Sequence, residues 1–133
     1  MASLMTEELG VSHRQLQILA ILWQAGEPLH RLEILRRFHE RFGDPIEDAS
    51  LRSHLRKMDL RDFLARQFAE REPHTMGRTP TLYSAKVKPA EILSQILGTV
   101  FGDVLGDDPA FLELGLRQLE ARLAKAKKRS SKA

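Results

Sequence analysis

The sequence predicts a mostly α-helical chain with one small β-hairpin, and three observations support this fold class. Apolar residues recur at helical spacing in five segments that together cover most of the 133 residues. Two short segments, 64–68 and 81–87, flank a turn that contains Gly77 and Pro80, as expected of a β-hairpin. The hairpin follows a helix, residues 50–58, that is dense in positive charge. The order helix, strand, basic turn, strand is typical of a winged helix-turn-helix domain.

The composition is that of a globular protein, with 42% apolar and 29% charged residues. A chain of 133 residues predicts one compact domain with an appendage. The absence of cysteine excludes disulfides, thiolate metal sites and cysteine nucleophiles. No secretory segment is recognisable, and the longest apolar run, Ile18 to Trp23, is too short to span a membrane. We therefore expect a soluble, cytoplasmic protein without a membrane partner.

The first two predicted helices are bounded by clear start and stop signals. Ser12 with Gln15 three residues later forms a capping box, and Gly26 ends the first helix. The second helix is predicted from Leu29 to Phe42, before the turn at residues 43–45. The residues expected to face the core are Leu16, Ile18, Leu19, Ile21, Leu22 and Trp23 in the first helix, and Leu29, Leu32, Leu35, Phe38 and Phe42 in the second.

The third helix is predicted to begin near Asp48 or Ala49. Leu51, Leu55 and Met58 recur at i, i+4 and i+7, so these side chains are expected to face the core. Asp62 is expected to end the helix in a left-handed conformation, which aspartate tolerates. A strand follows at residues 64–68, the hairpin tip covers 70–80, and the return strand runs over 81–87.

Charge is distributed unevenly along the chain, although the net charge is only +3. Residues 50–88 carry nine lysines and arginines against four acidic residues, whereas residues 1–49 carry five against eight. A helix fits the major groove of DNA, where arginine and lysine contact phosphates or guanine. The alternative is that these charged side chains only form the solvated side of a surface helix. The residues expected to contact DNA are Ser50, Arg52, Ser53, His54, Arg56 and Lys57 in the helix, with Arg78 and Thr79 in the turn.

The C-terminal third predicts two helices, one starting at Pro89 and one running from Ala110 to about Lys125. Their apolar faces are too wide to remain in water, which indicates self-association. A two-fold dimer would present two reading helices to a palindromic site. The domain organisation is thus a leader (1–11), a DNA-binding domain (12–88), a dimerisation region (89–125) and a disordered basic tail (126–133). The expected dimerisation residues are Leu93, Ile96, Leu97, Val100, Phe101, Leu112, Leu116 and Leu119.

The chain resembles the penicillinase-repressor family (BlaI/MecI type) over about residues 12–123. The matching segments are the first helix, the spacing of serine, leucine, lysine and methionine over 50–58, Phe63-Leu64 with Arg66, the Gly77-Arg78 turn with Tyr83, and residues 96–102. The resemblance implies a homodimeric transcriptional repressor that binds double-stranded DNA. Some members are inactivated by cleavage at an Asn-Phe bond and others sense copper through cysteines, but this chain has neither asparagine nor cysteine.

Other functions find less support in the sequence. The five histidines share no metal-ligand spacing, and no phosphate-binding glycine loop, serine elbow or metalloprotease motif is present. We therefore expect no catalytic residue, no metal and no cofactor, and the protein is not expected to be an enzyme. Two alternatives stay open. One is a PadR-type winged-helix regulator, and the other is a winged-helix interaction module whose basic face binds an acidic protein instead of DNA.

Overall fold

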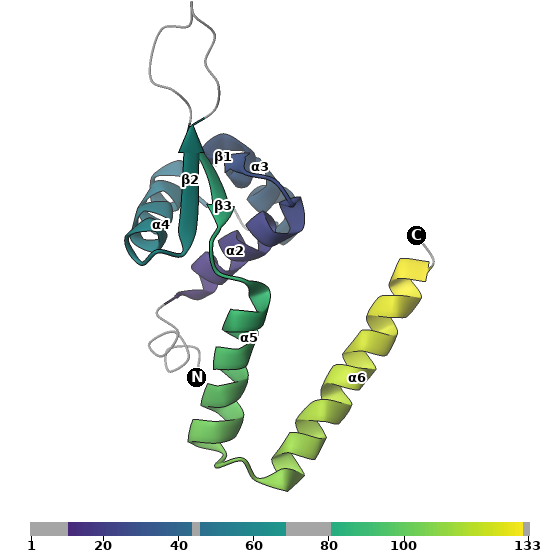
Figure 1. Ribbon diagram of the computed structural model, residues 1–133. Helices are drawn as coiled ribbons and strands as arrows, with labels where there is room; N and C mark the ends of the chain where they lie inside the picture. The colour runs from purple at the N-terminus through teal and green to yellow at the C-terminus, as the bar shows by residue number, and fades with distance from the viewer. Residues whose placement is uncertain (1–10, 44–45, 69–80, 132–133) are drawn as a thin grey trace, which may run out of the picture. The chain divides into compact units, whose positions relative to one another are not determined.

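The computed structural model describes residues 11–43, 46–68 and 81–131 and divides the chain into two compact units, Met1–Ile92 and Leu93–Ala133 (Figure 1). The described elements are mainly helices, together with one three-stranded antiparallel sheet. This composition confirms the predicted fold class. Along the chain they are α2 (His13–Ala25), β1 (Leu29–His30), α3 (Arg31–Phe42), α4 (Asp48–Leu60), β2 (Leu64–Phe68), β3 (Thr81–Ala85), α5 (Pro89–Leu97), the π-helical segment η1 (Gly98–Val104) and α6 (Pro109–Ser131).

Helix α2 begins and ends where the capping signals predict. The Ser12 side chain accepts a hydrogen bond from the Gln15 backbone N–H at 3.2 Å, and the Gln15 side chain accepts from the Ser12 N–H at 3.1 Å. The reciprocal pair satisfies two N–H groups that have no partner inside the helix. Gly26 ends the helix with φ of 68°, a left-handed conformation that glycine adopts without strain.

The second helix starts two residues later than the sequence predicts, because Leu29 and His30 form strand β1. Leu29 pairs with Tyr83 and His30 with Leu82 of β3. The extended backbone of His30 also suits its second role, since its imidazole Nδ1 accepts a hydrogen bond from the Leu32 N–H at 3.1 Å and caps α3. The predicted inclusion of Leu29 in the helix is therefore wrong, although Leu29 is buried as expected.

The inward face of α3 also differs from the prediction. Leu32 was expected in the core, but 55% of its surface is exposed. Phe38 is fully buried as predicted, and Ile34, one turn before it, is fully buried although it was not predicted. Residues 29, 32 and 35 recur every three residues, which is shorter than the helical period of about 3.6, so a helix does not keep them on one side.

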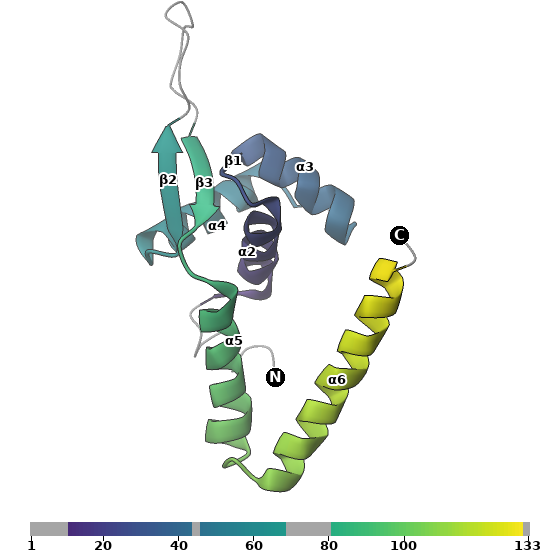
Figure 2. The same ribbon diagram turned by 45° about the vertical axis from the view of Figure 1, so that its right-hand side comes forward.

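Helix α4 follows the predicted pattern, and the two strands after it pair in a defined register. Leu51, Leu55 and Met58 are buried, and Asp62 has φ of 64° just beyond the helix end. Strand β3 lies between β1 and β2, with Arg66 opposite Tyr83 (Figure 2). Strand β3 ends at Ala85 instead of Val87. Residues 69–80, which include the predicted hairpin tip, lie outside the described part of the chain.

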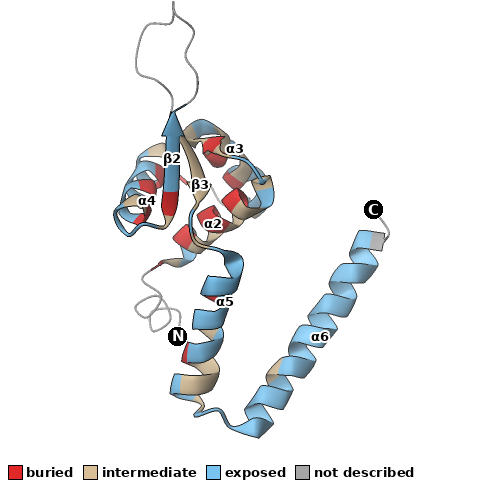
Figure 3. Ribbon diagram, in the orientation of Figure 1, coloured by how far each residue is buried: buried red, intermediate tan, exposed pale blue. Residues whose placement is uncertain are grey.

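The core of the first unit lies among α2, α3, α4 and the sheet (Figure 3). Helices α2 and α3 contact β3, while α4 contacts β2. The Trp23 indole N–H donates to the Val87 carbonyl at 2.9 Å and ties α2 to the segment after β3. The buried apolar residues are Ile18, Leu19, Ile21, Leu22, Leu29, Ile34, Phe38, Ile46, Leu51, Leu55, Met58 and Leu64.

The second unit departs from the predicted C-terminal organisation at two places. The first of its two predicted helices continues beyond α5 as the π-helical segment η1, which ends at Val104. Gly106 and Asp107, just beyond it, both have positive φ. Helix α6 extends to Ser131, whereas the sequence predicts an end near Lys125 and a disordered tail over 126–133. Alanine, lysine and arginine fill residues 124–129, and these strong helix formers, with cations near the C-terminus, favour continuation.

The difference between Phe38 and Leu32 provides a test of the fold. We expect Phe38→Ala to lower the free energy of unfolding by about 3–5 kcal/mol, because it removes a fully buried ring and leaves a cavity. Leu32→Ala, on the same helix, is expected to change it by less than about 0.5 kcal/mol. Urea unfolding of both variants measures the two changes. Equal losses would contradict the observed orientation of α3.

Candidate nucleic-acid interface

The outward side of α4 carries most of the residues predicted to contact DNA. Burial of Leu51, Leu55 and Met58 fixes which way the helix faces. The side chains between them are exposed, with one exception, His54, which is half-buried. The helix therefore presents Ser50, Arg52, Ser53, Arg56 and Lys57 to the surroundings. Arg78 and Thr79 of the predicted turn lie outside the described residues.

Two acidic residues on α4 hold arginines beside it in place. Asp48, the first residue of the helix, forms ion pairs with Arg31 of α3 and, at 3.3 Å, with Arg52 one turn along. Asp59 pairs with Arg66 of β2, also at 3.3 Å. Asp48 does not cap α4, since the N-cap residue is Glu47 and no side chain caps the helix. The two acids thus neutralise part of the positive charge and also orient it.

Four arginines surround one hollow of about 330 Å³ next to α4. They come from three elements, namely α4, the start of α3 and strand β2. Sequence reasoning identified Arg52 and Arg56 but missed Arg31, Arg66 and Tyr83 as parts of this site. Only the pairing register of the sheet, which sets Arg66 opposite Tyr83, could have revealed the grouping. The lining residues are Arg31, Arg52, Leu55, Arg56, Asp59, Arg66 and Tyr83.

Arg56 and Lys57 are two cations of this surface without an ionic partner among the described residues. Neither side chain forms an ion pair or a hydrogen bond with any of the residues that the structure describes. On α3, by contrast, Arg36 and Arg37 both bind Glu33, whose pKa the two guanidinium groups lower to about 2. Arg56 and Lys57 can therefore bind a polyanion without first breaking an internal ion pair.

His54 couples α4 to the start of α2. The Gln15 Nε2 amide lies 3.2 Å from His54 Nδ1, so the amide can donate to a neutral imidazole. Partial burial, and to a smaller extent the nearby charges of Lys57 and Arg14, lower the pKa of His54. The lowered pKa favours the neutral imidazole that can accept from the Gln15 amide.

Five of the eight predicted dimerisation residues are exposed, and the other three are half-buried. Leu97 of α5, Phe101 of η1 and Leu112, Leu116 and Leu119 of α6 line an apolar hollow of about 340 Å³ within the second unit. Gly115 lies against the Phe101 ring, where a methyl group would come within 2.4 Å of the ring carbon. Further exposed apolar residues, which the sequence analysis left out, are Val104, Phe111, Leu114 and Leu123.

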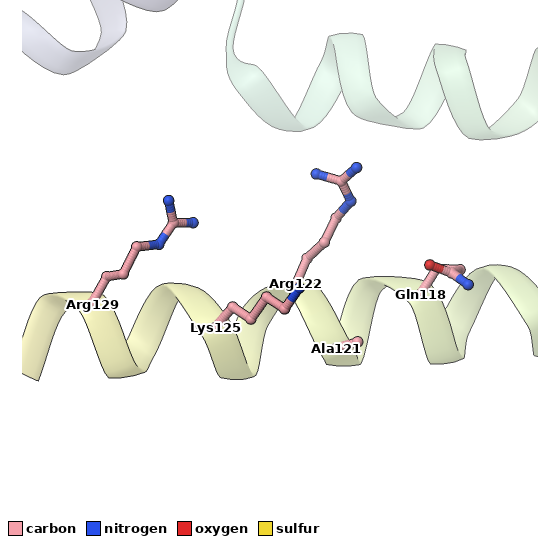
Figure 4. A pocket seen from close by; sticks show the side chains of 5 residues that line it. All are labelled: Gln118, Ala121, Arg122, Lys125 and Arg129. Carbon is pink, nitrogen blue, oxygen red and sulfur yellow. The ribbon is translucent and has the colours of Figure 1, made fainter.

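The other side of α6 is basic. Arg122, Lys125 and Arg129 follow one another at spacings of three and four residues, with Gln118 and Ala121 before them, and line a shallow hollow of about 290 Å³ (Figure 4). The helix therefore has an apolar stripe and a basic stripe. No group of three or more histidine or acidic side chains suited to a metal occurs in the described ranges. None of the described helices is long and apolar enough to cross a membrane.

Two comparisons with known proteins support the winged-helix fold. The family model of the Ribonuclease R winged-helix domain matches residues 16–76, which include most of α2 and all of the elements from β1 to β2. The structure of the hsRosR-S1 complex is similar with a TM-score of 0.53 and 16% identity, over 88% of this chain and 95% of the other. The structure of a Thermoplasma acidophilum protein described as a transcriptional regulator, TA0346, gives 0.45 and 21%, over 82% and 91%. No curated protein matches the chain significantly.

The environment of His54 predicts a pH dependence of stability. The folded state favours the neutral imidazole, so the unfolded chain takes up a proton first as the pH falls through 6.5, the ordinary pKa of this side chain. Stability is then expected to be full above pH 6.5 and to decrease below it. Thermal unfolding over about pH 5–8, with His54→Gln for comparison, measures the effect. A decrease of the same size in the variant would assign it to other groups.

Proposed function

We propose that this protein is a homodimeric, sequence-specific DNA-binding transcriptional repressor that occupies a palindromic operator in the cytoplasm. The resemblance to the penicillinase-repressor family suggests the same activity. The observation that carries the proposal is the orientation of α4, which buries Leu51, Leu55 and Met58 and leaves serines and cations outward on a winged-helix framework. Fold alone does not decide function, so the argument depends on these side chains.

The chemistry of α4 suits the major groove. Ser50 and Ser53 are small and exposed, so the helix backbone can approach DNA closely, and their hydroxyls can bind phosphate. Arg56 and Lys57 are exposed and free of ion pairs among the described residues, so they can donate to phosphates or to guanine. Arg52 shares Asp48 with Arg31, and a phosphate can replace the carboxylate as its acceptor.

The apolar face of the second unit supports the dimer. Isolated exposed leucines are common. Here Leu112, Leu116, Leu119 and Leu123 lie on one side of α6, and the first three line the apolar hollow together with Leu97. Exposed apolar surface of this extent is typical of interfaces between proteins. A second copy is the simplest occupant, because the C₂ dimer is the commonest oligomer and matches a palindromic site.

DNA binding can be tested with duplexes selected from a random library, followed by mobility-shift titrations at several salt concentrations. We expect the affinity of the full chain to fall steeply with salt, because each neutralised phosphate releases counterions. Arg56→Ala combined with Lys57→Ala is expected to weaken binding at least tenfold (an order-of-magnitude estimate) and to reduce the salt slope by about 2.

The matched control removes the same charge from α3 through Arg36→Ala and Arg41→Ala, two exposed arginines outside the interface. This variant should keep nearly the affinity of the unmodified chain. Equal losses in the two variants would mean that only net charge matters, and α4 would not be the reading helix. Failure to select any duplex, together with capture of an acidic protein, would favour the interaction module instead.

Dimerisation can be tested at two leucines of α6 with nearly the same exposure, 57% for Leu116 and 55% for Leu114. Leu116 lines the apolar hollow and Leu114 does not. We expect Leu116→Glu to weaken the dimer at least about 100-fold, or about 2.8 kcal/mol, since a charge would enter the interface. Leu114→Glu should have a much smaller effect. Sedimentation equilibrium measures both, and a monomeric unmodified chain at micromolar concentration would refute the dimer.

A further inference from the structure

We propose that the hollow lined by Arg31, Arg52, Arg56, Arg66 and Tyr83 is a phosphate-binding site. This site deepens the proposed function, because Arg52 and Arg56 belong both to the hollow and to the proposed reading helix. Arg31, Arg66 and Tyr83 lie outside α4. The phosphate can come from two sources, the DNA backbone or a small phosphate compound in solution, because both present the same oxygens to the guanidinium groups.

The geometry of the first unit brings the four guanidinium groups together. Arg52 and Arg56 are one turn apart on α4 and project from the same side of the helix. Arg66 stands opposite Tyr83 across the β2–β3 pair, and both line the hollow. Arg31 is the first residue of α3, its side chain is 22% exposed, and it forms an ion pair with Asp48. Three separate elements thus fix the positions of these groups.

The charge around the hollow is not balanced. Asp48 pairs with two of the arginines and Asp59 with a third, so two carboxylates face four guanidinium groups. Arg56 has no ionic partner in the part of the chain that is described, although Asp59 also lines the hollow. The excess of two positive charges suits one terminal phosphate group, which carries about −1.5 to −2 at pH 7, or two backbone phosphates of DNA, which carry one negative charge each.

The hollow is lined by charged and apolar side chains together. The side chains of Arg52 and Arg66 are 63% and 54% exposed, so water and salt weaken their attraction for an anion. Leu55 and Tyr83 also line the hollow. Its volume of about 330 Å³ corresponds to roughly ten water molecules at about 30 Å³ each. There is therefore room for a phosphate or diphosphate group with several waters.

Occupancy has a consequence for DNA binding. Arg52 and Arg56 line the hollow and also belong to the proposed reading helix. A free phosphate compound in the hollow would engage both side chains and reduce their availability to DNA. The site could thus connect DNA affinity to the concentration of a small phosphate compound, by competition and without a change of shape.

The test uses the full chain, inorganic pyrophosphate as the probe and the selected DNA duplex, at constant ionic strength. The key variant is Arg66→Gln, which changes the hollow at a residue of β2 and removes the ion pair with Asp59 but no cation of α4. Its matched control is Arg36→Gln on α3, because both arginine side chains are 54% exposed and ion-paired. Calorimetric titration measures pyrophosphate binding, and mobility shift measures DNA binding. Tyr83→Phe, which removes only a hydroxyl group, serves as a second variant, and circular dichroism checks folding.

If the proposal is correct, Arg66→Gln weakens binding of pyrophosphate, of DNA, or of both about tenfold, which equals about 1.4 kcal/mol, while Arg36→Gln changes neither. A loss for pyrophosphate identifies a free phosphate compound as a ligand, and a loss for DNA alone identifies the DNA backbone as the source. The proposal is overturned if neither affinity responds to Arg66→Gln, or if both arginine variants respond equally.

These outcomes distinguish a failure of the phosphate-site proposal from a failure of the proposed function. Pyrophosphate binding that depends on Arg66, in a protein that binds no duplex, would refute the reading helix and retain the phosphate site. Specific DNA binding that depends on Arg56 and Lys57, but is insensitive to Arg66 and accompanied by no pyrophosphate binding, would retain the reading helix and refute the phosphate site.

Discussion

Burial of the apolar side of α4 is the constraint on which the rest of the structure depends. Leu51, Leu55 and Met58 pack into the core formed by α2, α3 and the sheet, and each buried side chain of this kind contributes about 1.5–3 kcal/mol. Rotation of α4 about its axis would expose these residues and bury arginines that have no buried partner. The same packing that stabilises the domain therefore determines which side chains can meet a ligand.

Ion pairs then determine the net charge and the side-chain orientation of the surface that packing leaves exposed. Asp48 and Asp59 reduce the charge of the α4 face, but they also hold Arg31, Arg52 and Arg66 close to it. Partly exposed ion pairs of this kind add little to stability, so their main effect is on orientation. An arginine that is already oriented loses less side-chain entropy when it binds an anion. The acids near the proposed reading helix are thus compatible with a polyanion partner.

Local signals in the sequence predicted local structure well, whereas properties that depend on distant residues were missed. The capping box at Ser12, the left-handed Asp62 and the i, i+4, i+7 pattern of α4 each involve residues within one or two turns. The strand at Leu29 requires pairing with Tyr83, more than fifty residues away, so helical periodicity alone misplaced it. The hollow beside α4 depends on the same long-range register, which explains why only its α4 arginines were predicted.

Under the proposed function, DNA binding by the first unit depends on dimerisation through the second. A single α4 presents few cations that lack an ion-pair partner among the described residues. One domain would therefore bind DNA weakly at physiological salt. Association through the apolar side of α6 links two such helices, and binding of the second then becomes intramolecular, with a high effective concentration. Affinity for the operator would depend on the leucines of α6 as strongly as on the arginines of α4. A phosphate compound that occupied both hollows of the dimer would oppose both contacts at once, so a modest effect at each hollow would be multiplied at the operator.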